Sequence, residues 1–301
     1  MNSPYSEKRP GAHLKLRSPA KVNLFIEVHG RREDGYHDIE TVFQTIDLCD
    51  GISLRLTDSE MDFACTVGEL ETESNLCLRA ANLLRAATGE NRGVAIHLDK
   101  RIPWAAGFGG GSSNAATTLL GLRELWQLDV NDAELHNLAR QLGADVPFFL
   151  RQGCALGRGI GDELTPIDAR GEWEILIVKP PVSIRTAEVY AALDCEVMQR
   201  DGPRTSSALI SGLADGIFRE ICAGAYNRFE SVVMPLQPVV ARVKRILQDS
   251  GAGVAMLSGT GSGVFALYEQ PSAAHEAACR LDRNGDLQVF LTRTIRGIVM
   301  T

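Results

Sequence analysis

The stretch PWAAGFGGGSSNAATTLL, residues 103–120, combines glycines and hydroxyl groups in a pattern that suits phosphate binding. Four of its glycines fall within five positions, and Ser112 and Ser113 follow them at the start of a run of good helix formers. Glycine lets a ligand approach the main chain closely, and a helix N-terminus offers unpaired N–H groups and a positive dipole end. The stretch therefore predicts either a phosphate cradle or a tight strand-to-helix turn with serine caps.

Two other phosphate-binding motifs do not fit this stretch. A Walker A loop needs a lysine followed by serine or threonine after its last glycine, and no lysine follows here. A dinucleotide fingerprint needs different glycine spacing and an acidic residue after a βαβ unit, which the sequence lacks. Both classes of nucleotide site are set aside.

Two charged residues stand in apolar surroundings, where charge is costly to bury without a partner. Lys21 lies in SPAKVNL and Asp145 in GADVPFF. From the residues alone, Lys21 is favoured as an edge-strand lysine that reaches water, and Asp145 as the N-cap of a short helix. A second glycine turn, MLSGTGSGVFAL, contains Gly259, Gly261 and Gly263 and reads as a plain β-turn or as a ligand-closing turn.

The composition bounds the class of protein. The 301 residues are 45% hydrophobic and 23% charged, which is typical of a globular protein large enough for two domains. The net charge of −7 argues against nucleic acid or an anionic membrane as partner. Seven cysteines without a CxxC pair argue against a disulfide framework or a zinc site and favour a reducing cytoplasm. No signal peptide or transmembrane stretch is expected.

The elements that position these residues form two α+β halves. Residues 1–12 are expected to be a disordered extension, residues 13–164 an N-terminal domain and residues 165–301 a C-terminal domain. Apolar alternation predicts strands, and leucine and alanine at helical spacing predict helices. Strands are expected at 13–30 (as two short strands broken at Pro19), 39–48, 51–58, 61–67, 93–103, 173–180, 255–269 (two, around the glycine turn) and 287–295. Helices are expected at 75–89, 112–126, 132–141, 186–193, 238–251 and 271–282.

Three blocks in this order resemble the GHMP small-molecule kinases over residues 14–295. They are PAKVNL, GGGSSNAA and SGTGSGVFA. The resemblance implies a two-domain α+β fold, with an N-terminal domain like ribosomal protein S5, a C-terminal ferredoxin-like domain, and the active site between them. A further block, DGYHD with GADVPFFL, is similar to the branch of the family whose substrate carries a cytidine diphosphate.

The resemblance implies a role for each motif residue. Asp145 would be the general base and Lys21 its charge partner near the transferred phosphate. Tyr36 would stack on the cytosine, with His37 reading the base edge and Tyr190 on the other face, although Tyr190 reads equally as ordinary helix packing. The residues implied to bind ATP are Pro103, Ala106, Gly107, Gly109, Gly110, Gly111, Ser112 and Ser113. The residues implied to bind the substrate are Asn23, Tyr36, His37, Thr186, Tyr190, Gly259 and Gly261.

The implied function is an ATP-dependent and Mg²⁺-dependent kinase acting on the 2-hydroxyl of a cytidine-diphosphate-linked methylerythritol, in the non-mevalonate route to isoprenoid precursors. No protein ligand is assigned to Mg²⁺, although Ser112 or Ser113 is a candidate. A cytoplasmic monomer or weak homodimer is expected. The alternatives are another GHMP kinase, acting on homoserine or mevalonate, and a non-catalytic ATP-binding sensor. Trp104, Ala105, Ala106 and Asn114 depart from the residues common in the family loop, and Trp104 is expected to change how the adenine pocket is lined.

Overall fold

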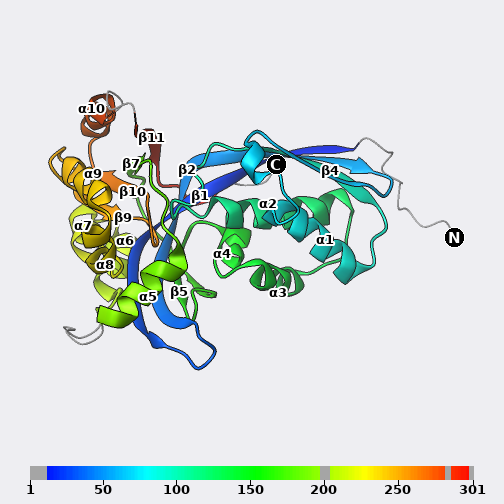
Figure 1. Ribbon diagram of the computed structural model, residues 1–301, viewed down its shortest axis with the longest axis horizontal. Helices are drawn as coiled ribbons and strands as arrows, with labels where there is room; N and C mark the ends of the chain where they lie inside the picture. Colours follow the sequence, from blue (N-terminus) through cyan, green and yellow to red (C-terminus); the bar gives the residue numbers. More distant parts are fainter. Residues whose placement is uncertain (1–11, 197–203, 282–285, 298–301) are drawn as a thin grey trace.

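The computed structural model describes residues 12–196, 204–281 and 286–297. The expected disordered extension, residues 1–12, lies outside this range except for residue 12. Two domains lie side by side along the long axis of the molecule (Figure 1). The N-terminal domain carries α1–α4, and the C-terminal domain carries α5–α10.

A sheet of seven strands, counted over the described residues, organises the N-terminal domain. Five of the strands follow the order β3-β4-β2-β1-β8, and β5 pairs with β2 on one side and with β6 on the other. The strands are β1 (His13–Arg31), β2 (His37–Thr57), β3 (Met61–Cys65), β4 (Gly93–Asp99), β5 (Cys154–Arg158), β6 (Glu163–Pro166) and β8 (Tyr226–Asn227).

The long β1–β2 hairpin corrects two expectations. Residues 13–30 form one strand and not two, because a register shift between Pro19 and Ala20 absorbs the proline, which has no N–H to donate to the ladder. Residues 39–48 and 51–58 likewise join into β2, since Cys49 and Asp50 pair with Pro19 and Ser18 of β1. Apolar alternation alone could not show that the pairing continues through these positions.

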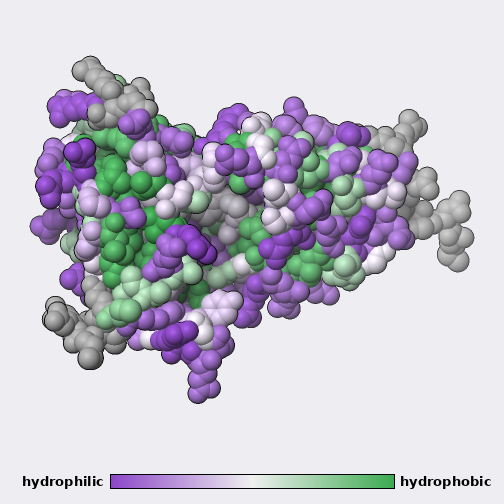
Figure 2. Space-filling view, viewed as in Figure 1, coloured by the Kyte–Doolittle hydropathy of each residue, from purple (hydrophilic) through white to green (hydrophobic). Residues whose placement is uncertain are grey.

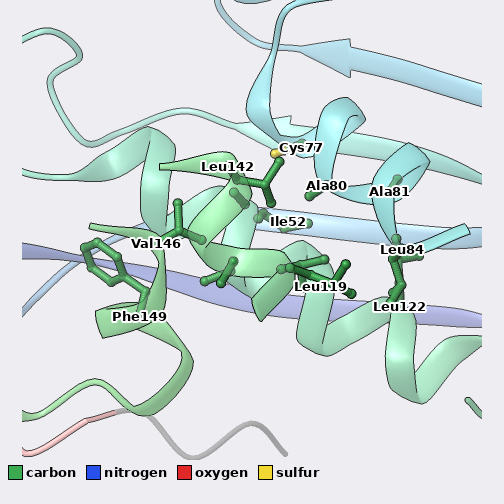
Figure 3. Packing of buried hydrophobic residues seen from close by; sticks show 14 of the residues in the cluster. Ile52, Cys77, Ala80, Ala81, Leu84, Leu119, Leu122, Leu142, Val146 and Phe149 are labelled. Atoms are coloured by element: carbon green, nitrogen blue, oxygen red, sulfur yellow. The ribbon is translucent and has the colours of Figure 1, made fainter. Parts of the chain in front are cut away.

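Four helices cover one face of this sheet: α1 (Leu76–Thr88), α2 (Gly110–Leu125), α3 (Asp132–Leu142) and α4 (Val146–Arg151). A short 3₁₀ turn, η1 (Gly68–Leu70), precedes them. Figure 3 shows Cys77, Ala80 and Leu84 of α1 close to Leu119 and Leu122 of α2, with strands of the sheet passing behind them. The helix boundaries follow capping chemistry: Asn75 caps α1, which ends on left-handed Gly89, and Asn131 with Glu134 forms a capping box on α3.

The C-terminal domain is built on an antiparallel sheet in the order β11-β7-β10-β9. The strands are β7 (Glu174–Lys179), β9 (Val254–Leu257), β10 (Val264–Tyr268) and β11 (Gln288–Arg293). The helices are α5 (Thr186–Glu196), α6 (Ser207–Asp215), α7 (Phe218–Gly224), α8 (Glu230–Leu236), α9 (Pro238–Gln248) and α10 (Pro271–Leu281). Residues of α5, α8, α9 and α10 form one apolar core with this sheet.

A third apolar core joins the two domains. Val22 and Leu24 of β1 belong to it together with Ile175 and Ile177 of β7, and residues of α6 and α7 close its edge. Strand β8 also crosses over, because it follows α7 in sequence but pairs in parallel with β1. The two-domain α+β fold is as predicted, whereas the border at 164/165 stays a prediction.

The surface of the two domains differs in character. On the face seen in Figure 2, apolar side chains gather mainly over the C-terminal helices, and polar side chains dominate the N-terminal domain. Within the residues described, no helix has the length and apolar character that crossing a membrane requires.

Candidate active site

Lys21 and Asp145 are 124 positions apart in the chain, but their side chains form an ion pair in the folded protein. Lys21 lies on β1, and Asp145 directly precedes α4. Lys21 Nζ lies 3.3 Å from Asp145 Oδ2, with the lysine side chain 4% exposed and the aspartate side chain 35% exposed. One charge is therefore buried while its partner still faces solvent, where a ligand can reach it.

Of the two interpretations made from the residues alone, the one for Lys21 is wrong, and the one for Asp145 is confirmed only for its position. Lys21 does not reach water: its Nζ donates to Asn23 Oδ1 at 2.6 Å and lies over the Phe43 ring, 5.4 Å from the centroid. Asp145 stands at the N-cap position of α4, but its side chain makes no capping hydrogen bond. The carboxylate is thus directed to the lysine and not to the helix backbone.

Asn23 holds the lysine in place. Its Oδ1 accepts from Lys21, its Nδ2 donates to Thr41 Oγ1 at 2.8 Å, and Thr41 donates onward to the Phe25 carbonyl. Asn23 is 3% exposed. The structure thus gives it a role in orienting Lys21, and the expected substrate contact stays a prediction.

The glycine stretch forms a turn that opens directly into α2. The helix begins at Gly110, two residues earlier than expected, with Gly109 in the left-handed conformation at its N-cap. A Cβ on Gly109 would lie 2.8 Å from Phe149 Cζ and 3.0 Å from Lys21 Cε, so only glycine allows the turn to lie against the lysine. The turn that opens α2 therefore lies against the Lys21 side chain, and a helix N-terminus in this place suits a phosphate.

The two glycine turns touch each other across the domains. Ser258 Oγ donates to the Gly107 carbonyl at 2.9 Å, and the Gly263 amide donates to the Ala106 carbonyl at 3.0 Å. A Cβ on Gly107 would lie 1.9 Å from the Ser258 carbonyl oxygen. Gly259 lies in the same contact, because its Cβ would approach Gly107 Cα to 3.4 Å. The second turn thus braces the first.

A buried polar network beneath the glycine turn went unnoticed in the sequence. Asp50 is 1% exposed; its Oδ2 lies 2.7 Å from Lys100 Nζ, and its Oδ1 accepts the amides of Arg101 and Ile102. Asn114, in the second turn of α2, donates to Asp50 Oδ2 at 2.9 Å. The network links β2 and the loop after β4 to the N-terminal part of α2. In the sequence, the only feature that pointed to it was the acidic residue Asp50 between two expected strands.

The hydroxyl groups of the loop are placed differently from each other. Ser113 is fully buried and accepts a 2.8 Å hydrogen bond from Ser18, which in turn accepts one from Asn114. Ser112 is half-buried, Pro103 and Ala106 are buried, and Gly111 is exposed. Trp104 is 41% exposed. The proposed nucleotide contacts of these residues stay predictions, with Ser112 the better placed of the two serines.

The residues expected to bind a base come together only in part. His37 stacks on Tyr190, with ring centroids 4.6 Å apart, and Tyr190 packs edge-on against Phe229. Burial, followed by the negative charge of Asp145, raises the pKa of Tyr190 to about 12, so its hydroxyl stays protonated. Tyr36 is 60% exposed. Because His37 covers one face of Tyr190, a base stacked on Tyr190 must use the other face or displace the imidazole.

The N-terminal end of α5 meets the second glycine turn. Thr186 is the first residue of α5, and its Oγ1 lies 3.0 Å from Thr260 Oγ1. Gly261 packs against Leu257 and Ile184. The two threonine hydroxyls form an exposed pair that joins the start of α5 to the second glycine turn, and they offer donors and acceptors to a polar substrate group.

A cavity outside this site was not predicted from the sequence. It measures about 1140 Å³, is lined by α3, α4, β5, β6 and residues 294–296, and contains none of the predicted site residues. Among the described residues there is no group of three or more His, Cys, Asp or Glu side chains that could hold a metal ion.

Comparison with known proteins identifies the family. The GHMP kinases N terminal domain matches residues 75–153, and the GHMP kinases C terminal domain matches residues 207–287. Chains named 4-diphosphocytidyl-2-C-methyl-D-erythritol kinase are similar throughout. That of Alkaliphilus metalliredigens is 41% identical over 266 residues, 88% of this chain and 91% of the relative, and that of Geobacter sulfurreducens is 42% identical over 269 residues, 88% and 93%.

Solved structures agree. A crystal structure of 4-(cytidine 5'-diphospho)-2C-methyl-D-erythritol kinase superposes with a TM-score of 0.79 at 36% identity, covering 94% of this chain and all of that one. The mevalonate kinase of L. major, with a TM-score of 0.78 at 17% identity over 98% of this chain and 99% of its own, shares the fold. The chain belongs to the GHMP kinases, and within them to the family of the 4-diphosphocytidyl-2-C-methyl-D-erythritol kinases.

Proposed function

We propose that this protein is an ATP-dependent kinase that phosphorylates the 2-hydroxyl of 4-diphosphocytidyl-2-C-methyl-D-erythritol, giving the 2-phosphate and ADP in the non-mevalonate route to isopentenyl diphosphate. The observation that carries the proposal is the Lys21–Asp145 pair, whose lysine lies against Gly109 of the glycine turn. Similarity to proteins of this name over about nine-tenths of the chain supports the substrate.

The pair suits phosphoryl transfer to an alcohol. Asp145 accepts the proton of the substrate hydroxyl, whose oxygen forms a bond to the γ-phosphorus while the bond from that phosphorus to the bridging oxygen breaks and ADP leaves. The ammonium of Lys21, 3.3 Å from the carboxylate, offsets the negative charge that develops during the transfer. The α2 N–H groups orient the phosphates, so the chain contributes mainly alignment and charge.

ATP, the phosphoryl donor, needs a divalent cation, and the described residues offer few ligands for that ion. Since no acidic cluster for a metal lies among the described residues, Mg²⁺ would be held chiefly by phosphate oxygens and water, with the half-buried Ser112 as the protein ligand. All seven cysteines are free thiols, which supports a reducing cytoplasm. We also propose that the protein is a monomer or a weak homodimer.

The base pocket and the catalytic pair separate the alternatives. Homoserine and mevalonate have no ring to stack on Tyr36 or Tyr190, so the aromatic group near α5 favours a nucleotide-linked substrate. A sensor without activity has no need for an ion pair placed as Lys21 and Asp145 are. Because the chain has both the aromatic group near α5 and the Lys21–Asp145 pair, the cytidine substrate is favoured over the alternatives.

The experiment measures ADP release from Mg·ATP with diphosphocytidyl methylerythritol, homoserine and mevalonate in parallel, using wild type and Asp145→Ala. Turnover with the cytidine substrate alone, lost in the variant, is expected. Preference for homoserine or mevalonate would make this another GHMP kinase. ATP binding without turnover of any of the three would favour the sensor.

A further inference from the structure

Asp194, a carboxylate of the C-terminal domain, contacts both strands that flank the turn carrying Tyr36. Arg31 and His37 are register partners at the end of the β1–β2 hairpin. Asp194 Oδ1 lies 2.7 Å from His37 Nε2, and Asp194 Oδ2 lies 3.9 Å from Arg31 Nη1. In Figure 1, α5 lies across this hairpin. Asp194 therefore bridges the domains at the expected base pocket.

Asp194 and Tyr190 act on the same imidazole. They lie four positions apart on α5, which places both side chains on one face of the helix. Tyr190 covers the face of the His37 ring, and Asp194 takes one nitrogen of its edge. With its side chain 9% exposed, His37 is fixed in both tilt and rotation about its ring axis.

The carboxylate also decides where the imidazole proton lies. An ionised carboxylate can only accept a hydrogen bond, so Nε2 must be the donor. In neutral imidazole the other nitrogen, Nδ1, then carries a lone pair and can only accept. Among the described residues, the hydrogen bond to Asp194 at Nε2 is the only one that the His37 ring makes. This acceptor is left for a ligand.

We propose that Asp194 is the positioning residue that sets base specificity: it holds His37 with the proton on Nε2, so that Nδ1 accepts from the exocyclic amino group of cytosine. A uracil carries a carbonyl oxygen at that position, which would face the Nδ1 lone pair. The inference rests on the proposed function for its choice of base, and it assigns to Asp194 the discrimination between amino and carbonyl groups.

The test compares the binding of CDP and UDP by isothermal titration calorimetry, with the donor site saturated by ADP. Wild type is expected to prefer CDP by about tenfold or more, as one buried hydrogen bond and its mismatch allow. In Asp194→Asn the amide can either donate or accept, so His37 can adopt either tautomer, and the preference is expected to fall to about twofold. Glu188→Gln, which removes an exposed charge from the same helix away from His37, is expected to keep the wild-type preference.

Kinetics give a second readout. For Asp194→Asn we expect KM for the cytidine substrate to rise by about tenfold with kcat within about threefold, because the reacting groups are untouched. An unchanged CDP preference in Asp194→Asn overturns the inference, as does a wild type without any preference. Loss of turnover in wild type with CDP preference intact would instead count against the proposed function alone.

Discussion

Replacing Gly107 by alanine tests the contact between the two glycine turns. The residue has φ +83°, which costs a side chain about 1–2 kcal/mol. The new Cβ would also lie 1.9 Å from the Ser258 carbonyl oxygen, so the turns must separate. Separation breaks the Ser258–Gly107 and Gly263–Ala106 hydrogen bonds, worth about 1 kcal/mol each. We expect a total loss of about 3–4 kcal/mol.

Gly89→Ala is the matched control. Gly89 has φ +67°, but a Cβ added there would meet no atom within 4 Å, so this variant carries the backbone strain without the collision. Calorimetry should find the Tm of Gly107→Ala lower than that of Gly89→Ala by roughly 4 °C or more, since each kcal/mol shifts Tm by about 2–4 °C. KM for ATP should rise only in Gly107→Ala. Equal Tm values and equal ATP kinetics would refute the view that the second turn braces the first.

Three further perturbations probe other parts of the site and the fold. Lys21→Met should lower kcat by about 10²–10³, because it removes the charge beside Asp145; an unchanged kcat in steady-state assays would contradict the role given to Lys21. Asp50→Asn should lower the free energy of unfolding by about 3–5 kcal/mol in urea, because Lys100 would remain buried without its counter-charge, and a change below about 1 kcal/mol would show the network to be dispensable. Hydrogen bonding to Arg92 lowers the pKa of Glu90 to about 2, below its usual value, so this pair stabilises the fold above about pH 4.5 and the stabilisation is lost as pH falls toward 2. Glu90→Gln should flatten the fall of Tm across that range, and an unaltered acid slope would argue against the pair.

The motifs and the approximate bounds of six helices were readable in the sequence because local chemistry determines them, whereas α6, α7 and α8 were not expected. Asn75 and Gly89 delimit α1 through a cap and a left-handed end, and both follow from residue type. The glycine stretch was placed correctly before α2, although the helix starts at Gly110, two residues early, with left-handed Gly109 at its N-cap and no side-chain cap. Such features depend on neighbours within a few residues.

Features that depend on tertiary partners could not be read in the same way. Burial of Lys21 results from Asn23, Phe43 and Asp145 converging on it, and the isolated sequence favoured an exposed lysine. Continuity of β2 through Asp50 reflects pairing with β1, and the acid finds its partner 50 positions away in Lys100. Asp194 gave no signal at all, because nothing near it in the sequence points to His37.

Single-turnover kinetics of Asp145→Asn test the central claim most directly. The variant keeps the shape of the side chain but cannot take the hydroxyl proton. With Mg·ATP and the cytidine substrate bound, we predict that the rate of phosphoryl transfer in a quenched-flow experiment falls by about 10²–10⁴, while Kd for both ligands stays within about threefold of wild type. A variant that transfers phosphate at the wild-type rate would contradict the assignment of Asp145 as the base at this site.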